Sequence, residues 1–163
     1  MTVLRTLCAA LALGIATSPA MAQEAPPDSP EARRIVELVR KAATFIEQNG
    51  KAAAFAAFRK QGSEWLSGTT YLFSYDLDGK VLLNPAFPKR EGTNPAAAGE
   101  RDAKGKALHR EILETAKTKG EGWVDYWFPK PGQVDPSQKW TYVKAVKIDG
   151  VPGLIGAGFY PDS

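Results

Sequence analysis

The hydrophobic positions in the first part of the chain recur at helical spacing. Apolar side chains return every three or four residues, which places them on one face of a helix. These positions are Ile35, Leu38, Val39, Ala42 and Ile46. Asp28 or Ser29 can cap the first turn, and Asn49-Gly50 predicts the end of this long amphipathic helix. A second, alanine-rich helix follows in the stretch KAAAFAAFRK and ends near Gly62.

The pattern then changes to a period of two, which is typical of a strand. Tyr71, Phe73 and Tyr75 point to one face of this strand, and the residues between them point to the other. The stretch DLDG that follows predicts a tight hairpin turn. Residues 80–83 are therefore expected to return as a paired strand.

The second half of the chain combines a long loop, one helix and three strands. Residues 84–98 have loop chemistry and are long enough to cover part of a sheet. Asp102 is expected to cap a helix that ends at Gly120. The three strands are predicted at residues 122–128, 139–148 and 154–160. This order predicts an α+β fold in which a long N-terminal helix packs on a five-stranded antiparallel sheet.

The run GWVDYWFPKPG at residues 122–132 is unusually rich in aromatic rings. In a strand, Val124, Tyr126 and Phe128 share one face, and Trp123 and Trp127 share the other. Both faces are therefore expected to be covered, one by the long helix and the other by the segment from 84 to 120. The space beneath that segment is the natural place for a small-molecule pocket.

The N-terminus has the features of a secretory signal peptide over residues 1–22: a positive residue, a short apolar run and a small-residue cleavage site. Residues 23–32 are then a flexible lead-in, and residues 33–163 a single domain. The apolar run is too short to span a membrane, and no later stretch is long enough. Cys8 precedes most of that run, which argues against a lipidation cysteine. Periplasmic localisation is expected.

Signal cleavage also removes the only cysteine, and the loss of Arg5 lowers the formal charge from +3 to +2. Basic and acidic residues are interspersed, so nothing argues for nucleic acid as a partner. The chain has one histidine, His109, and no thiol nucleophile after cleavage. A triad, a metal site of histidines and cysteines, and a c-type haem are all disfavoured, so the protein is not expected to be an enzyme and no cofactor is indicated.

Amphipathic and cationic groups stand out on the predicted strands. They are Tyr71, Tyr126, Lys139, Tyr142 and Lys144. A pocket for a small anion needs a cation, a few hydrogen-bond donors and aromatic walls, and this set supplies all three. The alternative is that the lysines are solvated at sheet edges and the tyrosine hydroxyls lie in water.

Three stretches carry a resemblance to a known family. They are YLFSYDLDGKVLLNP, RDAKGKALHREILETAKTKGEGWVDYWFPKPG and KWTYVKAVKIDGVPGLIGAGFY. Together they resemble the single Cache domain of the second type, found in the extracytoplasmic parts of bacterial chemoreceptors and sensor kinases. The resemblance implies a PAS-like antiparallel sheet preceded by a long helix, and a pocket for a small metabolite, often a short carboxylate.

The resemblance also implies roles for individual residues. Lys139 is expected to contact the carboxylate, with Tyr126 and Tyr71 as hydrogen-bond donors and Trp123 and Phe73 as walls. Tyr142 matches a second position of the motif that contains Lys139. Because the two are three residues apart, they face opposite sides of a regular strand, and one of them is expected to be structural. Asn84 stands where the family often has a histidine.

Two functions from different classes follow. The first is a periplasmic module that binds a small carboxylate and, since the sequence ends three residues after Tyr160, signals through a separate membrane receptor, sensor kinase or transporter. The alternative is a non-catalytic structural or interaction module whose pocket has collapsed around its own aromatic side chains. An inward Lys139 beside a cavity favours the first, and a solvated Lys139 over a filled interior favours the second.

Overall fold

The structure is a computed structural model that describes residues 26 and 28–161. The signal peptide expected at residues 1–22 lies outside the described residues, as do residues 23–25 and 27 of the expected lead-in. The elements are α1 (Pro30–Phe58), β1 (Leu66–Ser67), β2 (Thr70–Asp76), β3 (Val81–Leu83), the 3₁₀ turn η1 (Pro88–Arg90), α2 (Leu108–Glu114), the π-helical turn η2 (Thr115–Lys119), β4 (Glu121–Pro129), β5 (Pro136–Ile148) and β6 (Val151–Phe159).

Helix α1 begins where the sequence predicts it. The Ser29 hydroxyl accepts a hydrogen bond of 3.0 Å from the Ala32 amide and so caps the first turn. Gly50 interrupts the helix with φ 76° and ψ 166°, values that glycine adopts at little cost, and a second helical segment continues to Phe58. The two helices expected from the sequence are thus joined at a kink.

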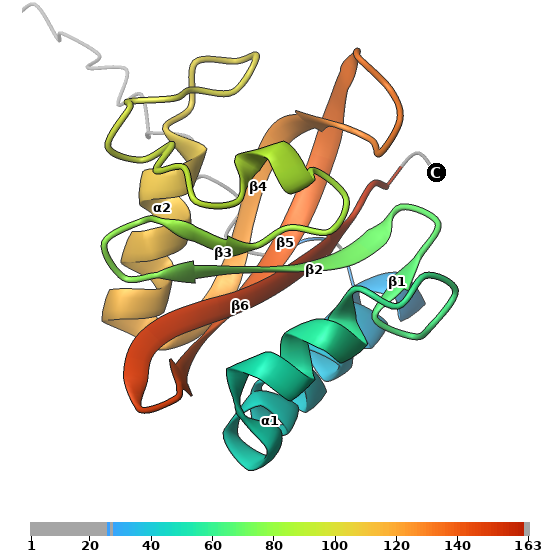
Figure 1. The fold of residues 1–163 in the computed structure, drawn as a ribbon. Helices are drawn as coiled ribbons and strands as arrows, with labels where there is room; N and C mark the ends of the chain where they lie inside the picture. The colour runs from blue at the N-terminus through green and yellow to red at the C-terminus, as the bar shows by residue number, and fades with distance from the viewer. Residues whose placement is uncertain (1–25, 27, 162–163) are drawn as a thin grey trace, which may run out of the picture.

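The strands form one antiparallel sheet in the order β1-β2-β6-β5-β4, with β3 paired to β2 (Figure 1). The predicted α+β fold, a long N-terminal helix on an antiparallel sheet, is confirmed. The sequence pattern did not indicate β1, which is only two residues long. Strand β6 lies between β2 and β5, so its side chains are central to both faces of the sheet.

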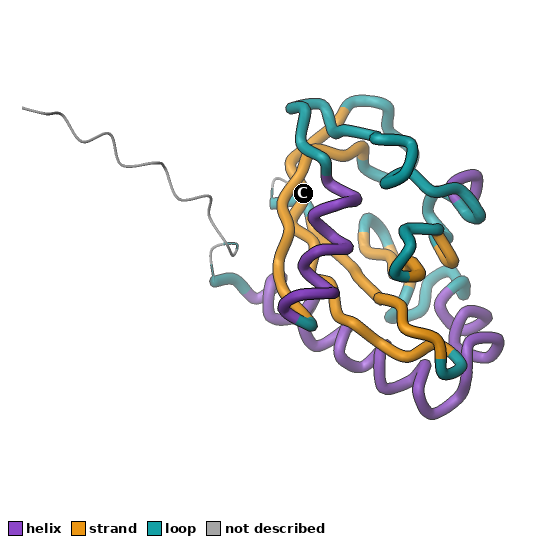
Figure 2. The backbone as a smooth tube through the Cα atoms, turned by 90° about the vertical axis from the view of Figure 1, so that its left-hand side faces the viewer, coloured by secondary structure: helices purple, strands orange, loops and turns teal. Residues whose placement is uncertain are grey.

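Helices lie on either side of the sheet (Figure 2), and its two faces bury different sets of side chains. Helix α1 covers one face, where its stripe from Ile35 to Ile46 packs against Leu72, Tyr142 and Ile155. The other face contains Tyr71, Phe73 and Tyr75 and packs against α2. The alternation predicted for β2 therefore assigned its side chains to the correct faces.

The expectation that Asp102 caps a helix is wrong. Gly105 has φ 83° and the chain turns there, so α2 begins only at Leu108. The Asp102 carboxylate instead accepts hydrogen bonds from the backbone amides of Lys104 and Lys106, both at 2.8 Å, and from the amide of Trp127 at 2.9 Å. Asp102 thereby attaches the covering segment, residues 84–120, to the edge strand β4.

In the part of the chain that the structure describes, no helix has the length and hydrophobicity needed to cross a membrane.

Candidate functional site

The candidate site is built around Lys139 on β5. Its side chain is completely buried, and its ammonium group donates a hydrogen bond of 2.9 Å to the hydroxyl of Tyr71 on β2. Strand β6 lies between these two strands, and Gly158 on β6 is opposite Thr141. A Cβ atom at Gly158 would lie 2.7 Å from Cε of Lys139. The lysine side chain therefore crosses β6 where that strand has no side chain.

Aromatic rings surround the Lys139 ammonium group. It lies 4.0 Å from the ring centroid of Tyr71, 5.3 Å from that of Tyr160 and 6.0 Å from that of Phe128. Among the described residues, no carboxylate lies at ion-pair distance from it. Burial without a counter-charge lowers the pKa of Lys139 from 10.5 to about 7.

Further hydroxyl groups lie on the same face of the sheet. The hydroxyls of Tyr126 and Thr141 are 2.8 Å apart and share a hydrogen bond. Burial raises the pKa of Tyr126 to about 12 and that of Tyr71 well above its usual range. Both tyrosines therefore keep their protons at neutral pH and can donate hydrogen bonds to an anion.

Phe73 forms a wall on this face. Its ring lies over Gly156 of β6, where a Cβ atom would be only 2.6 Å from Cζ of Phe73. The ring also packs against Tyr75, with 5.3 Å between the two centroids. Gly156 and Gly158 thus leave room on the central strand for side chains of its neighbours.

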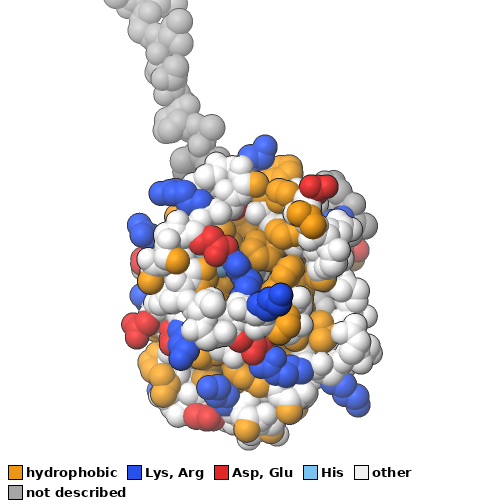
Figure 3. All heavy atoms as spheres, turned by 45° about the horizontal axis from the view of Figure 1, so that its top comes forward, with side chains coloured by type: hydrophobic (Ala, Val, Ile, Leu, Met, Phe, Trp, Pro, Cys, Tyr) orange, Lys and Arg blue, Asp and Glu red, His pale blue; other side chains and the backbone are white. Residues whose placement is uncertain are grey.

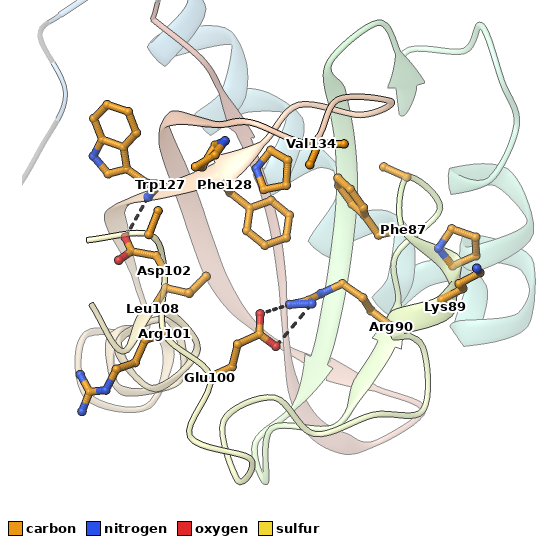
Figure 4. Close-up of a pocket in the computed structure, with 15 residues that line it drawn as sticks. Phe87, Lys89, Arg90, Glu100, Arg101, Asp102, Leu108, Trp127, Phe128 and Val134 are labelled. Carbon is orange, nitrogen blue, oxygen red and sulfur yellow. Dashed lines mark hydrogen bonds and ion pairs between the residues drawn. The ribbon is translucent and has the colours of Figure 1, made fainter. Parts of the chain in front are cut away.

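A groove of about 600 Å³ opens to solvent beside this cluster. Its walls come from the covering segment and from the β4–β5 hairpin, and Figure 3 shows hydrophobic side chains gathered at this end of the molecule among charged ones. Phe87 and Phe128 line it and pack edge to face, 5.2 Å between centroids (Figure 4). Phe87 also contacts Tyr71, at 5.8 Å between centroids. Phe128 thus borders both the groove and Lys139, and Phe87 borders both the groove and Tyr71.

A polar network lies next to the groove. The Arg90 guanidinium is paired with the Glu100 carboxylate (Figure 4) and stacks 5.3 Å from the Phe128 ring centroid. His109 is buried, with Nδ1 3.1 Å from the Tyr75 hydroxyl and Nε2 3.4 Å from a Glu100 oxygen. Burial lowers the pKa of His109. This histidine is fully engaged with its neighbours, which suits a structural role.

The structure does not bring every expected site residue to Lys139. Tyr142 and Trp123 lie on the opposite face of the sheet, where their rings pack 5.1 Å apart beneath α1. Asn84 is buried in a turn, and its side-chain oxygen accepts a hydrogen bond of 3.1 Å from the Phe87 amide. Lys144 is paired with Glu121 at 2.9 Å.

Four residues of the cluster were not among those expected from the sequence, and one of them, Phe128, shares the Tyr126 face of β4. Phe87 lies in a loop, which has no periodic pattern. The only sequence signal for Thr141 and Tyr160 is the alternation of strand positions, which places them on the face of the sheet that Lys139 shares. Thr141 shares the Lys139 face because it is two residues further along β5. Tyr160 closes the stretch GAGFY, in which alternate positions fall on the same face as Gly158.

The arrangement has the chemistry of a site for a small organic anion. A carboxylate beside Lys139 would supply the missing counter-charge, and the tyrosine and threonine hydroxyls would complete its hydrogen bonds. Aromatic walls exclude water and strengthen such a contact. No group of three or more histidine, cysteine, aspartate or glutamate side chains is arranged to hold a metal ion within residues 26 and 28–161.

Comparisons with known proteins agree with this fold. Residues 32–163 match the sequence profile of a family described as Cache domain. Over 92 residues, 56% of this chain, the sequence is 35% identical to the methyl-accepting chemotaxis protein McpP of Pseudomonas putida KT2440. The matched segment spans only 16% of that receptor.

Solved structures with the same fold include two that also share sequence. A periplasmic sensor domain of a chemotaxis protein is 28% identical, with a TM-score of 0.61 over 78% of this chain and 88% of that one. A Cache chemosensory domain described for its recognition of carboxylic acid is 26% identical, with a TM-score of 0.67 over 80% of this chain and 92% of that one. A methyl-accepting chemotaxis protein from Vibrio parahaemolyticus also shares the fold. It is 18% identical, with a TM-score of 0.64 over 80% of this chain and 88% of that one.

Proposed function

The chain belongs to the Cache domain family, and from this premise we propose that it binds a short carboxylate at Lys139 and acts as an extracytoplasmic sensing module. The observation that carries the proposal is the buried ammonium group of Lys139, which has no carboxylate at ion-pair distance among the residues that the structure describes. Its side chain is held inside an aromatic enclosure at a substantial energetic cost. A ligand that neutralises the charge would offset this cost.

The neighbouring groups define the ligand. The carboxylate accepts hydrogen bonds from Lys139 and Tyr71, and a small hydrophobic remainder lies against Phe128 and Phe87. A structure described for carboxylic acid recognition by a Cache chemosensory domain supports this ligand class.

We further propose that the bound state is read by a membrane protein, which is a receptor, a sensor kinase or a transporter. Support comes from the similarity to the chemotaxis protein McpP and to a periplasmic sensor domain. The same similarity supports a periplasmic location. The proposed role is binding without turnover.

One observation favours the alternative of a structural or interaction module. Phe87 and Phe128 line the groove and pack edge to face, Lys139 is not among the residues that line it, and the lysine already donates a hydrogen bond to Tyr71. In that alternative the rings stay closed and the groove serves as a docking surface. The two functions differ in whether a small ligand stabilises the fold.

Thermal unfolding with acetate, propionate, lactate and pyruvate tests the proposal. A ligand at one hundred times its dissociation constant adds about 2.7 kcal/mol to the free energy of unfolding. The increase should disappear in Lys139→Met and persist in the control Lys144→Met, whose lysine lies on the same strand but is paired with Glu121. A ligand effect that survives in Lys139→Met would remove Lys139 as the anchor. Absence of any effect across the panel would favour the docking module.

A further inference from the structure

We propose that Lys139 binds 2-oxo acids covalently and reversibly, by condensing with the keto group to form an imine, and that Tyr71 is the proton donor for this step. The inference rests on the proposed carboxylate site and names a ligand class within it. It distinguishes pyruvate-like ligands, which have a keto group next to the carboxylate, from acetate and propionate, which do not.

The surroundings of Lys139 are those of a reactive amine. Imine formation requires a neutral amine, and a lysine enclosed by apolar surface loses its proton readily. Lys139 is completely buried among the rings of Tyr71, Tyr160 and Phe128. Within the described residues, no acidic side chain at ion-pair distance holds it in the charged form, and its pKa is lowered to about 7 by burial.

Three other lysines of the chain lie in the opposite situation. Lys41 is paired with Glu64, Lys106 with Glu111 and Asp125, and Lys144 with Glu121, and these lysine side chains are between 30% and 59% exposed. A carboxylate partner and contact with water both favour the ammonium form, which is not nucleophilic. We therefore expect imine formation to be selective for Lys139.

Tyr71 is positioned to move the protons. Its hydroxyl oxygen is 2.9 Å from Nζ of Lys139, within the range needed for general acid catalysis. Burial raises the pKa of Tyr71 well above its usual range, so the hydroxyl is protonated at neutral pH. The Tyr126 and Thr141 hydroxyls, which lie on the same face, remain available to the carboxylate.

The reaction balances without an oxidant or reductant. Nζ of neutral Lys139 adds to the keto carbon, forming a C–N bond, and one amine proton moves to the former keto oxygen. Tyr71 then gives a proton to this hydroxyl group, which leaves as water as the C=N bond forms. The second amine proton returns to Tyr71, so an amine and a ketone give an imine and water. The imine can take up a proton from solvent, and the resulting cation lies beside the carboxylate of the same ligand.

Reductive trapping tests the proposal. The purified protein is incubated with pyruvate and cyanoborohydride, which reduces an imine to a stable secondary amine, and the modified lysine is located by peptide mass mapping. The expected adduct is at Lys139, in excess over Lys144 on the same strand, and added propionate suppresses it by competition. In Lys139→Arg, no adduct forms at this position.

A separate measurement, the rate of reductive trapping, tests the role of Tyr71 as proton donor. In Tyr71→Phe, the rate of trapping at saturating pyruvate should fall by about 100-fold or more, because a general acid contributes at least that factor. A change in affinity alone does not alter the rate at saturation. An unchanged rate would overturn the assignment of Tyr71.

Two results would overturn the covalent step itself and can be told apart. If pyruvate raises the unfolding temperature but adducts form only at exposed lysines, the imine is excluded and the carboxylate site stands. If no carboxylate stabilises the protein and Lys139 is not modified, the proposed function fails together with the imine.

Discussion

The ammonium group of Lys139 reaches the hydroxyl group of Tyr71 across the central strand of the sheet, at 2.9 Å. The two residues are on β5 and β2, with β6 between them. Gly158 leaves the path open, since a Cβ atom there would collide with the lysine side chain. A buried cation, a hydroxyl partner and a glycine thus form one structural unit, and four expectations follow from it.

Replacing the cation should stabilise the ligand-free protein. In Lys139→Met, the free energy of unfolding at pH 7 should rise by about 1 to 4 kcal/mol, because the charge no longer has to be buried. Equilibrium denaturation by urea measures this change. The control Lys144→Met removes a partly exposed ion pair and should cost at most about 1 kcal/mol. A large loss of stability in Lys139→Met would mean that the amine contributes to the fold itself.

The stability of the wild-type protein should depend on pH through Lys139. The unfolded chain keeps the lysine protonated up to about pH 10.5, whereas the folded protein releases that proton near pH 7. Between these values the unfolded state binds more protons, so stability rises with pH, by at most about 1.4 kcal/mol per pH unit. The destabilising effect is fully present below pH 7.

Denaturation series at pH 6 to 9.5 in wild type and Lys139→Met test this dependence, with the difference between the two curves isolating the lysine. Buried tyrosines such as Tyr71 and Tyr126, whose pKa values are raised, affect stability only above about pH 10. Parallel curves for the two proteins would show that Lys139 titrates normally.

Binding of a carboxylate without a keto group should show the opposite dependence on pH. Propionate pairs with the protonated lysine, so its affinity should fall as pH rises above about 7, approaching tenfold per pH unit. Below pH 7, down to the pKa of the ligand, the affinity should be constant. Calorimetric titration in buffers of different ionisation enthalpy would also reveal uptake of a proton on binding at pH 8. A flat affinity from pH 6 to 9 would contradict the role of Lys139.

Gly158→Ala should disturb both the fold and the site. Its Cβ atom would lie 2.4 Å from the Trp140 carbonyl oxygen and 2.5 Å from Oγ1 of Thr141, as well as close to Lys139. Overpacking of this kind costs about 1 to 3 kcal/mol. Propionate-dependent stabilisation should weaken as well, because the lysine is displaced.

The matched control is Gly122→Ala on the edge strand β4. Its Cβ atom would meet only the methyl group of Thr115, at 3.0 Å, and Thr115 is not part of the Lys139 cluster. Thermal unfolding of both variants, with and without propionate, separates packing from binding. Equal effects of the two substitutions would show that Gly158 has no special relation to the site.

The covering segment shows where sequence reasoning failed. Asp102 has the residue type and position of a helix cap, but Gly105 turns the chain and the carboxylate binds the Trp127 amide instead. Phe87 lies in a loop without periodicity, so no pattern could place it against Tyr71 and Phe128. Trp123 and Tyr142 lie in the stretches that carry the resemblance to the Cache family, and they pack beneath α1.

The sequence by itself determined the helical stripe of α1, the alternation in β2 and the opposite orientation of Lys139 and Tyr142. These features depend on the repeat of a helix or a strand, which is a local property of the chain. Only the tertiary structure decided that Lys139 is buried, that it contacts Tyr71, and that no carboxylate of the described part of the chain pairs with it. Burial and pKa depend on groups that folding brings from distant positions, here residues 71, 128, 158 and 160, and no local pattern encodes their distances.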